Sequence, residues 1–218
     1  MQKLRYRSSL TDSISSIKIS HTESNSNLLG PFDRFIIWVY GCCFDCEGCV
    51  AINTRFGAYN EILIDDLADE IIKSSCEGVT ISGGEPFLQA QELLILLQKI
   101  KKVRDVGVIV YSGFTLSEIK NDVSKSPLLN EIDILIDGRY EKNLDDSRAY
   151  VGSSNQVIYY LTERYKNVGA KYYSESKRKA EIKITHSQAI LIGVPSSEVL
   201  DLWRNLKKKS SGSAADCQ

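Results

Sequence analysis

Four of the chain's six cysteines lie in one short segment, YGCCFDCEGCV, at residues 40–50. Cys42, Cys46 and Cys49 follow the spacing C-x-x-x-C-x-x-C. Three thiolates on a short loop can hold three corners of an iron–sulfur cube, for which four cysteines would be a full complement. A missing fourth ligand leaves one iron open to a substrate or cofactor, as in catalytic metal sites that keep an open position. The pattern therefore predicts a metal centre held by Cys42, Cys46 and Cys49.

Other interpretations of these cysteines stay open. A structural zinc site needs four ligands, and the chain's two histidines, His21 and His186, are remote in sequence but could approach in the fold. Cys43 and Cys46 form a C-x-x-C pair without a thioredoxin-like context, which makes a redox pair a weaker interpretation. Several of the cysteines could also be small buried residues, although a polar, glycine-containing loop disfavours that reading. The role of Cys43 is left open.

A second candidate element is the segment SGGEP at residues 82–86. One interpretation is a tight turn from a strand to a helix, with glycine dihedral angles and a proline at the helix start. The functional interpretation is a backbone edge that a small ligand can approach closely. Glu85 then offers its carboxylate to an ammonium group.

The elements that position these motifs alternate along the chain. Continuous apolar runs, typical of strands buried on both faces, occur at 34–40, 78–82, 106–113 and 131–138. Helical spacing follows at 63–75 and 87–102, and a Thr115-x-x-Glu118 capping box opens a helix through Lys120. This alternation predicts an α/β fold with a mostly parallel sheet and outer helices, either an open sheet or a partial (β/α) barrel. Ligands in such folds gather at the carboxyl ends of the strands, where the special segments lie.

The rest of the chain is less regular. We expect an edge strand at 16–20, a turn feeding a helix at 152–165, and a polar connection at 166–179. One or two strands at 181–195 and a capped terminal helix at 196–209 follow. The expected organisation is a polar N-terminal segment (1–16), a core (17–165), a C-terminal appendage (166–209) and a disordered tail (210–218).

Composition narrows the class of protein. The 218 residues are 43% hydrophobic, which is enough for one sizeable core, and the net charge is −1. Nothing in this balance indicates nucleic acid as a partner. The chain has no apolar run long enough to span a bilayer and no secretory signal, so we expect a cytoplasmic protein without a membrane partner. Structural disulfides are rare in that compartment, which favours metal binding for clustered cysteines.

Together these motifs resemble the radical S-adenosylmethionine (SAM) superfamily. Within it, the chain looks most like the glycyl-radical enzyme activases that act on anaerobic ribonucleotide reductase. The resemblance covers roughly residues 17–165 and rests on five ordered motifs. These are Cys42-x-x-x-Cys46-x-x-Cys49, Gly83-Gly84-Glu85-Pro86, YSGFT at 111–115, Asp137-Gly138 and GSSNQ at 152–156.

The resemblance implies a set of site residues and cofactors. Cys42, Cys46 and Cys49 would ligate one 4Fe–4S cluster, and SAM would bind its open iron. The implied SAM-binding residues are Gly83, Gly84 and Glu85 at the methionine amine, with Ser112 and Asn155 along the remaining surface. The helix expected after Gly152 would aim its N–H groups at the SAM carboxylate. No residue is assigned as catalytic, because the cofactor carries the chemistry.

The implied activity begins when an external one-electron donor, such as flavodoxin or ferredoxin, reduces the cluster. SAM then breaks to methionine and a 5′-deoxyadenosyl radical, which abstracts hydrogen from a glycine of a partner glycyl-radical enzyme. Two positions depart from the family pattern: Glu47 replaces a proline and Arg55 replaces a tryptophan. About fifty extra C-terminal residues also depart from it. The alternative is a radical SAM enzyme that modifies a small molecule or a ribosomal peptide. A non-catalytic iron–sulfur or zinc protein is a third class.

Overall fold

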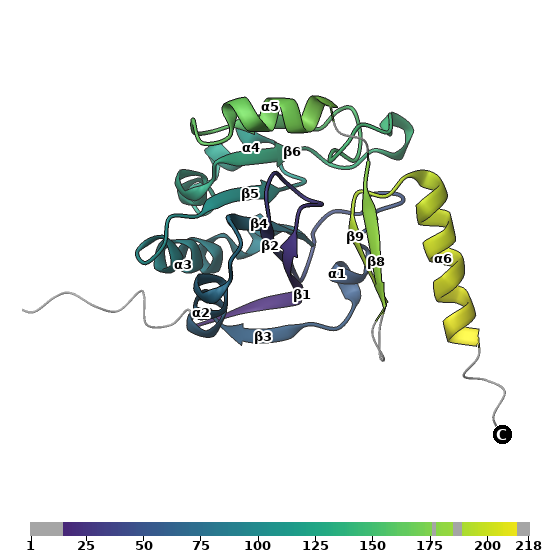
Figure 1. Cartoon of the computed structure of the whole chain (residues 1–218), viewed down its shortest axis with the longest axis horizontal. Coiled ribbons are helices and arrows are strands. Elements are labelled where there is room, and N and C mark those ends of the chain that lie inside the picture. The colour runs from purple at the N-terminus through teal and green to yellow at the C-terminus, as the bar shows by residue number, and fades with distance from the viewer. Residues whose placement is uncertain (1–14, 176–177, 185–188, 213–218) are drawn as a thin grey trace, which may run out of the picture.

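The computed structural model describes residues 15–175, 178–184 and 189–212, and its main feature is a seven-stranded sheet (Figure 1). The strand order is β3-β1-β2-β4-β5-β6-β7. The strands are β1 (Ser16–Ser26), β2 (Arg34–Val39), β3 (Asn60–Leu63), β4 (Gly78–Gly83), β5 (Gly107–Tyr111), β6 (Ile134–Asp137) and β7 (Val157–Tyr160). Most of the expected N-terminal segment (1–16) and of the tail (210–218) lies outside the described residues, so the expected domain boundaries stay a prediction.

The centre of the sheet is parallel. β2, β4, β5 and β6 pair in parallel, whereas β1, β3 and β7 run antiparallel to their neighbours at the two sides. The central strands are the continuous apolar runs of the sequence, and nearly all their side chains are buried. A strand covered on both faces needs such a run. The expected α/β class with a mostly parallel sheet and flanking helices is confirmed, while the partial barrel stays a prediction.

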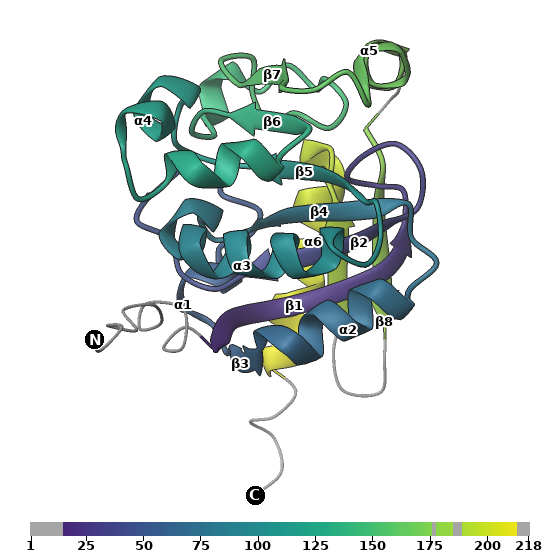
Figure 2. The ribbon, with the colours of Figure 1, turned by 90° about the vertical axis from the view of Figure 1, so that its left-hand side faces the viewer.

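Helices cover one face of this sheet, as Figure 2 shows. They are α2 (Ile64–Lys73), α3 (Ala90–Lys101) and α4 (Leu116–Asn121), with the 3-10 turns η1 (Pro86–Gln89), η2 (Ser126–Glu131) and η3 (Lys142–Leu144) between elements. Their apolar side chains and one face of the strands form the main core, which includes Cys76. The predicted capping box is present: Thr115 accepts from the Glu118 N–H, and Glu118 accepts from the Thr115 N–H. Among the described helices, none has the length and apolar character needed to cross a bilayer.

A β-bulge divides β1 into two halves. Ile19 pairs with Val39, but His21 rather than Ser20 pairs with Trp38, so the register shifts at Ser20. Side chains alternate between the faces of a strand, and an extra residue changes which of them share a face. Ile17 and Ile19 enter the core under the helices, whereas Ser20 and His21 line a cavity.

Arg34 joins the central strands near their amino ends. Its guanidinium is fully buried and donates to the Glu77 carboxylate at 2.6 Å, the Tyr165 hydroxyl at 2.6 Å and the carbonyls of Val79 and Gly107. Its Nε also donates to the Thr80 hydroxyl. A buried charge is tolerated only when it is paired and hydrogen-bonded, and Arg34 meets that condition.

One expected helix is absent. The segment after Gly152 is a turn followed by β7, which pairs antiparallel with β6 from Ile134↔Tyr160 to Asp137↔Val157. Val, Ile and Tyr favour strands, and pairing satisfies the open edge of β6. The prediction of a helix at 152–165, with its N–H groups aimed at a ligand carboxylate, is therefore wrong.

Two smaller expectations also change. The segment 16–20 is not an edge strand, because β3 pairs on its outer side and forms the edge instead. The polar connection at 166–179 contains the helix α5 (Lys166–Glu175). Its interior glycine, Gly169, and its weak apolar periodicity conceal the helix in the sequence, since glycine is a poor helix former.

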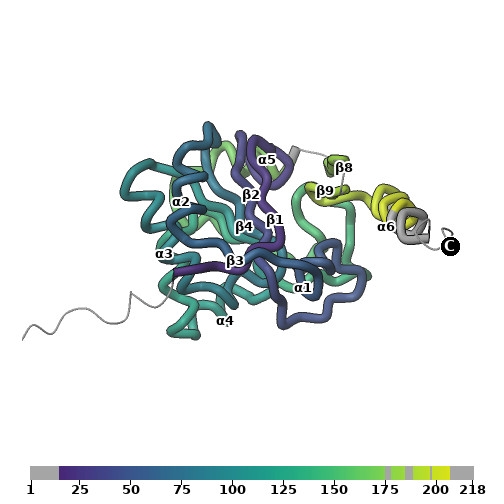
Figure 3. Tube along the Cα trace, turned by 90° about the horizontal axis from the view of Figure 1, so that it is seen from below, coloured from purple at the N-terminus to yellow at the C-terminus, as the bar shows by residue number. Residues whose placement is uncertain are grey.

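The part of the expected C-terminal appendage that follows α5, called the appendage from here on, lies on the sheet face opposite α2 and α3 (Figures 1 and 3). It consists of the antiparallel pair β8 (Ala180–Ile184) and β9 (Ala189–Gly193) and the helix α6 (Ser197–Gly212). The expected strands at 181–195 are thus two, and the expected terminal helix is present. His186 lies outside the described residues. Ile192 is fully buried against Leu28, Leu29 and Ile36, so the hairpin closes a second apolar cluster.

Candidate functional site

A cavity of about 560 Å³ opens where the carboxyl ends of β2, β4, β5 and β6 meet the C-terminal appendage. A volume of this size is typical of small-molecule sites. The segments that the sequence singled out converge here, as expected for a parallel sheet. The predicted site residues that line it are Cys42, Cys46, Cys49, Gly83, Gly84, Glu85 and Ser112.

The cysteine loop directly follows β2. Cys42, Cys46 and Cys49 are half-buried free thiols that line the cavity, whereas Cys43 is exposed and does not line it. Burial raises the pKa of Cys42 to about 11 and also raises the pKa of Cys49. The Cys42 and Cys49 thiols are therefore protonated at neutral pH, and a metal would have to displace their protons.

The three thiols line one cavity, where each could bind a different iron of one cluster. Among the described residues, no group of three or more His, Cys, Asp or Glu side chains is close enough together to hold one metal ion. A single tetrahedral zinc would draw its sulfur ligands to about 3.8 Å from one another, given Zn–S bonds of about 2.3 Å. In an iron–sulfur cube each thiolate binds a different iron, which demands a wider spacing. His21 lines the same cavity, but it lies on β1 and not in the cysteine loop.

The turn Gly83–Glu85 holds the base of the cysteine loop. The Gly84 N–H donates to the Val39 carbonyl at 2.9 Å, and the Glu85 N–H donates to the Gly41 carbonyl at 2.7 Å. A Cβ atom on Gly84 would lie 1.9 Å from the Gly41 oxygen, and one on Gly83 would lie 2.6 Å from the Val39 nitrogen. Gly83 also has a φ of +106°, which favours glycine. Only glycine fits at both positions.

Glu85 is almost fully buried beside this turn. Its carboxylate accepts hydrogen bonds from the Phe87 N–H, the Ser112 hydroxyl and the Gly113 N–H, at 3.0, 2.9 and 2.7 Å. Burial outweighs these donors and raises the pKa of Glu85 to about 7. Glu85 therefore links the ends of β4 and β5, in addition to the predicted role toward an ammonium group.

Asn155 lies apart from the other predicted site residues. It does not line the cavity; its amide donates to the Arg139 carbonyl at 2.8 Å. The neighbouring Gln156 does line the cavity, donates to the Gly138 carbonyl and accepts from the Gly152 N–H, both at 2.7 Å. Gln156 thus closes the turn that replaces the expected helix.

Sequence reasoning missed several residues of the cavity, among them Ser20, Trp38, Tyr150, Ile190 and Trp203. His21 was considered only as a possible zinc ligand, and Tyr111 only as part of the YSGFT motif. Burial lowers the pKa of His21, so its imidazole is neutral at pH 7. Both tryptophans of the chain are among these residues, and that rarity is the one signal the sequence offered.

Cationic side chains surround the cysteine loop. Arg55 pairs with Asp45, and Lys142 pairs with Glu47 at 2.8 Å. The exposed Arg139 guanidinium lies 4.5 Å from the centre of the Phe44 ring. Cations near a cluster stabilise the negative charge that thiolate ligands bring.

The fold and the cavity define an α/β protein with a cysteine-lined site at the carboxyl edge of its sheet. Residues 28–159 match the family described as "4Fe-4S single cluster domain", which covers more than half of the chain. The anaerobic ribonucleoside-triphosphate reductase-activating protein of Pasteurella multocida is 35% identical over 62% of this chain and 91% of that relative. The chain belongs to this family of glycyl-radical enzyme activases.

Two further relatives are also named as activating proteins or enzymes. The anaerobic ribonucleoside-triphosphate reductase-activating protein of Enterobacteria phage T4 is 29% identical over 62% of this chain and 88% of that relative. The pyruvate formate-lyase-activating enzyme of Listeria monocytogenes is 36% identical over 35% of this chain and 34% of that enzyme. The resemblance inferred from the motifs is thus confirmed at the level of the family.

Proposed function

We propose that this chain is a radical SAM enzyme that binds one 4Fe–4S cluster through Cys42, Cys46 and Cys49. The observation that carries the proposal is the placement of these three thiols, without Cys43, around the cavity that the turn Gly83–Glu85 also lines. The match to a 4Fe-4S single cluster domain supports the same assignment. In this proposal the strands and helices around the site are those of the radical SAM partial barrel.

When bound and reduced, the cluster supplies the electron that cleaves SAM to methionine and a hydrogen-abstracting 5′-deoxyadenosyl radical. Gly83 and Gly84 let the methionine amine approach the backbone, because neither has a side chain in the way. Glu85 and Ser112 hold that backbone edge in place through their mutual hydrogen bond. Asn155 acts from outside the cavity by fixing the Arg139 carbonyl. The appendage keeps water from the site.

The proposed substrate is a glycine on a partner enzyme, because the named relatives activate other enzymes. The reducing electron comes from a small redox protein such as flavodoxin or ferredoxin. The proposed compartment is the cytoplasm, where thiols stay reduced. The alternative substrate, a small molecule or a ribosomal peptide, is favoured by one observation: the appendage narrows the cavity with residues outside the family match.

The cluster assignment is tested by anaerobic reconstitution of the full chain and of two cysteine variants. We expect about four irons per chain and 5′-deoxyadenosine on addition of SAM and dithionite. Cys46→Ala should abolish 5′-deoxyadenosine formation, whereas Cys43→Ala, the matched control, should retain the iron and the activity. Tight zinc without an absorbing cluster, or full activity of Cys46→Ala, contradicts the proposal. The substrate is tested by placing deuterium on glycine in candidate partners and following it into 5′-deoxyadenosine.

A further inference from the structure

One wall of the cavity is formed by residues outside the segment that matches the family model. The appendage contributes Ala189, Ile190, Leu191, Gly193, Val194 and Trp203 to the cavity lining. All six residues follow the matched segment 28–159. The Pasteurella multocida relative is matched over 91% of its length, so few of its residues remain outside the match to form such an appendage. This wall consists of apolar side chains and one glycine.

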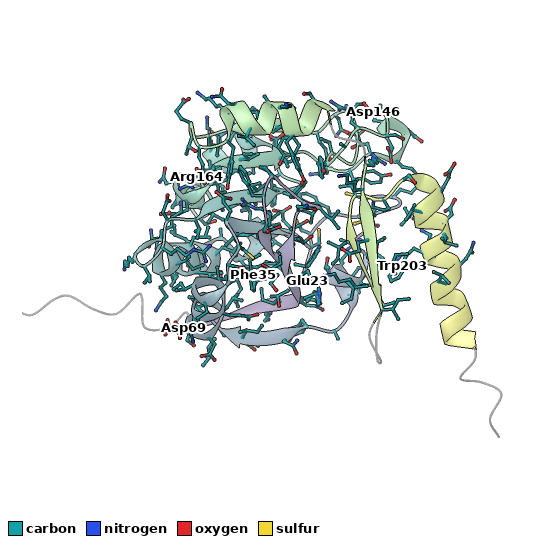
Figure 4. All side chains as sticks on the ribbon, in the orientation of Figure 1. Glu23, Phe35, Asp69, Asp146, Arg164 and Trp203 are labelled. Atoms are coloured by element: carbon teal, nitrogen blue, oxygen red, sulfur yellow. The ribbon has the colours of Figure 1, made fainter. Side chains whose placement is uncertain are left out.

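The appendage wall is fixed against the sheet. Ile192 is fully buried beside Leu28, Leu29 and Ile36, and Ile190 and Val194 pack against the same cluster. Trp203 is 8% exposed and points from α6 toward the hairpin, as Figure 4 shows. An ion pair of 2.7 Å between Lys183 on β8 and Glu23 on β1 joins the hairpin to the sheet. The wall is therefore part of the folded site.

The β-bulge of β1 faces the cavity beside this wall. His21 pairs with Trp38 directly after the extra residue Ser20, and the His21 and Trp38 ring centres are 5.4 Å apart. Bulges are frequent next to active sites, where they redirect side chains. The Ser20 Oγ and His21 Nε2 atoms are buried, and neither has a hydrogen-bond partner in the part of the chain that the structure describes. Buried polar atoms of this kind are rare and call for a ligand or ordered water.

We propose that Ser20, His21, Trp38, Ile190 and Trp203 form a substrate pocket, here called the bulge pocket. Its occupants are the apolar residues that flank the substrate glycine already proposed, so the pocket selects the neighbours of that glycine and not the glycine itself. The inference rests on the proposed function and names the kind of partner segment that enters. A peptide backbone offers an N–H donor and a carbonyl acceptor, which a hydroxyl and a neutral imidazole can pair with. The apolar wall disfavours charged side chains, because burying an unpaired charge is costly.

The bulge pocket is adjacent to the cofactor turn. Trp38 on β2 pairs with Ser82 on β4, and Gly83 follows Ser82 directly. A peptide seated against Trp38 therefore lies one strand away from the turn Gly83–Glu85. That placement suits a substrate whose hydrogen must meet a radical formed beside this turn.

The pocket can be tested by peptide binding, since both tryptophans of the chain line the cavity. The probes are acetyl-Val-Gly-Val-amide and acetyl-Glu-Gly-Glu-amide. Binding is followed by tryptophan fluorescence on the metal-free full chain and by calorimetry on the reconstituted, SAM-loaded chain. We expect saturable binding of the valine peptide and at least about tenfold weaker binding of the glutamate peptide. Absence of binding in both forms, or equal binding of the two peptides, overturns the inference.

Variants test the contribution of the apolar wall separately from that of the polar side chain of His21. Ile190→Glu should weaken binding of the valine peptide by about tenfold. Its matched control is Ile184→Glu, because Ile184 lies on the same hairpin but is 77% exposed. His21→Phe keeps a ring against Trp38 and removes the nitrogen, so we expect weaker binding with an unchanged melting temperature. Unchanged affinity in both Ile190→Glu and His21→Phe contradicts the bulge pocket.

The two proposals fail in different ways. Formation of 5′-deoxyadenosine from SAM and dithionite needs no peptide and reports only on the cluster and SAM. If the wild-type protein forms 5′-deoxyadenosine but Ile190→Glu leaves the peptide affinity unchanged, the bulge pocket is wrong and the radical SAM assignment stands. If peptides bind as expected but neither a cluster nor 5′-deoxyadenosine forms, the proposed function is wrong.

Discussion

The carboxyl group of Glu85 is subject to two opposing effects. Three hydrogen-bond donors favour its charged form, whereas almost complete burial favours its neutral form. Burial outweighs the donors, and the pKa rises from 4.5 to about 7. A carboxyl group with a raised pKa binds its proton more tightly in the folded chain than in the unfolded chain. Its contribution to stability is therefore complete below pH 4.5 and is lost as the pH rises toward 7.

We expect Glu85→Gln to remove this pH dependence. The difference in unfolding free energy between wild type and Glu85→Gln should be larger at pH 5 than at pH 8, by up to about 3 kcal/mol. Urea unfolding of the metal-free proteins at both pH values measures it. Asp69→Asn, on the exposed side of α2 (Figure 4), is the control and should show no such change. A difference that grows with pH would mean that the hydrogen bonds outweigh burial.

At the scale of elements, the site depends on how closely β4 approaches the loop after β2. A side chain on Gly84 would collide with the backbone oxygen of Gly41, and backbone atoms cannot swing aside as a flexible side chain can. Gly41 is the natural comparison, because a Cβ atom there meets nothing within 4 Å although its φ is +94°. The two glycines thus separate steric contact from backbone strain.

Gly84→Ala should destabilise the chain by about 3 kcal/mol, at the upper end of overpacking effects. Gly41→Ala should cost about 1–2 kcal/mol, from the dihedral angle alone. Urea unfolding measures both losses, and iron content after reconstitution shows whether the cysteine loop keeps its position. We expect the lower iron content in Gly84→Ala. Equal losses in the two variants would contradict the steric argument.

At the scale of the whole molecule, one arginine joins the appendage to the core. Arg178 forms an ion pair of 2.6 Å with Asp145, and its side chain is 6% exposed. The guanidinium also donates to the carbonyls of Arg148, Val151, Gly152 and Pro195. These contacts come from the loop before β7 and from the chain between β9 and α6. Arg178 therefore helps to hold the apolar wall over the cavity, together with the buried Ile192 and the Lys183–Glu23 ion pair.

Arg178→Ala should loosen the appendage without unfolding the sheet. We expect hydrogen exchange to accelerate in β8, β9 and α6, which corresponds to a loss of about 3 kcal/mol for a broken buried pair. Arg178→Lys should restore only part of the protection, because an ammonium group cannot reach all these acceptors. Arg204→Ala removes an exposed pair with Asp201 and should have little effect. Equal acceleration across β2 and β4 would indicate global unfolding instead.

The sequence by itself determined the local features of this protein. The cysteine spacing, the turn Gly83–Glu85, the buried parallel strands and the capping box at Thr115 could all be predicted, because each depends on residues close in the chain. The family could be predicted for the same reason, since its motifs are short and ordered. Residues 157–160 show where prediction from local sequence fails. They were expected to form part of a helix, but they form a strand because they pair with the open edge of β6.

Only the tertiary structure decided which distant residues share the cavity. Ser20 and His21 face it because β1 carries a bulge, and Ile190 and Trp203 reach it because the appendage folds back over the sheet. Cys43 is exposed, whereas Cys42, Cys46 and Cys49 are half-buried and line the cavity. These placements follow from register, packing and burial between segments up to about 180 residues apart. A local sequence pattern cannot contain that information, because the contacts form only when the whole sheet is assembled.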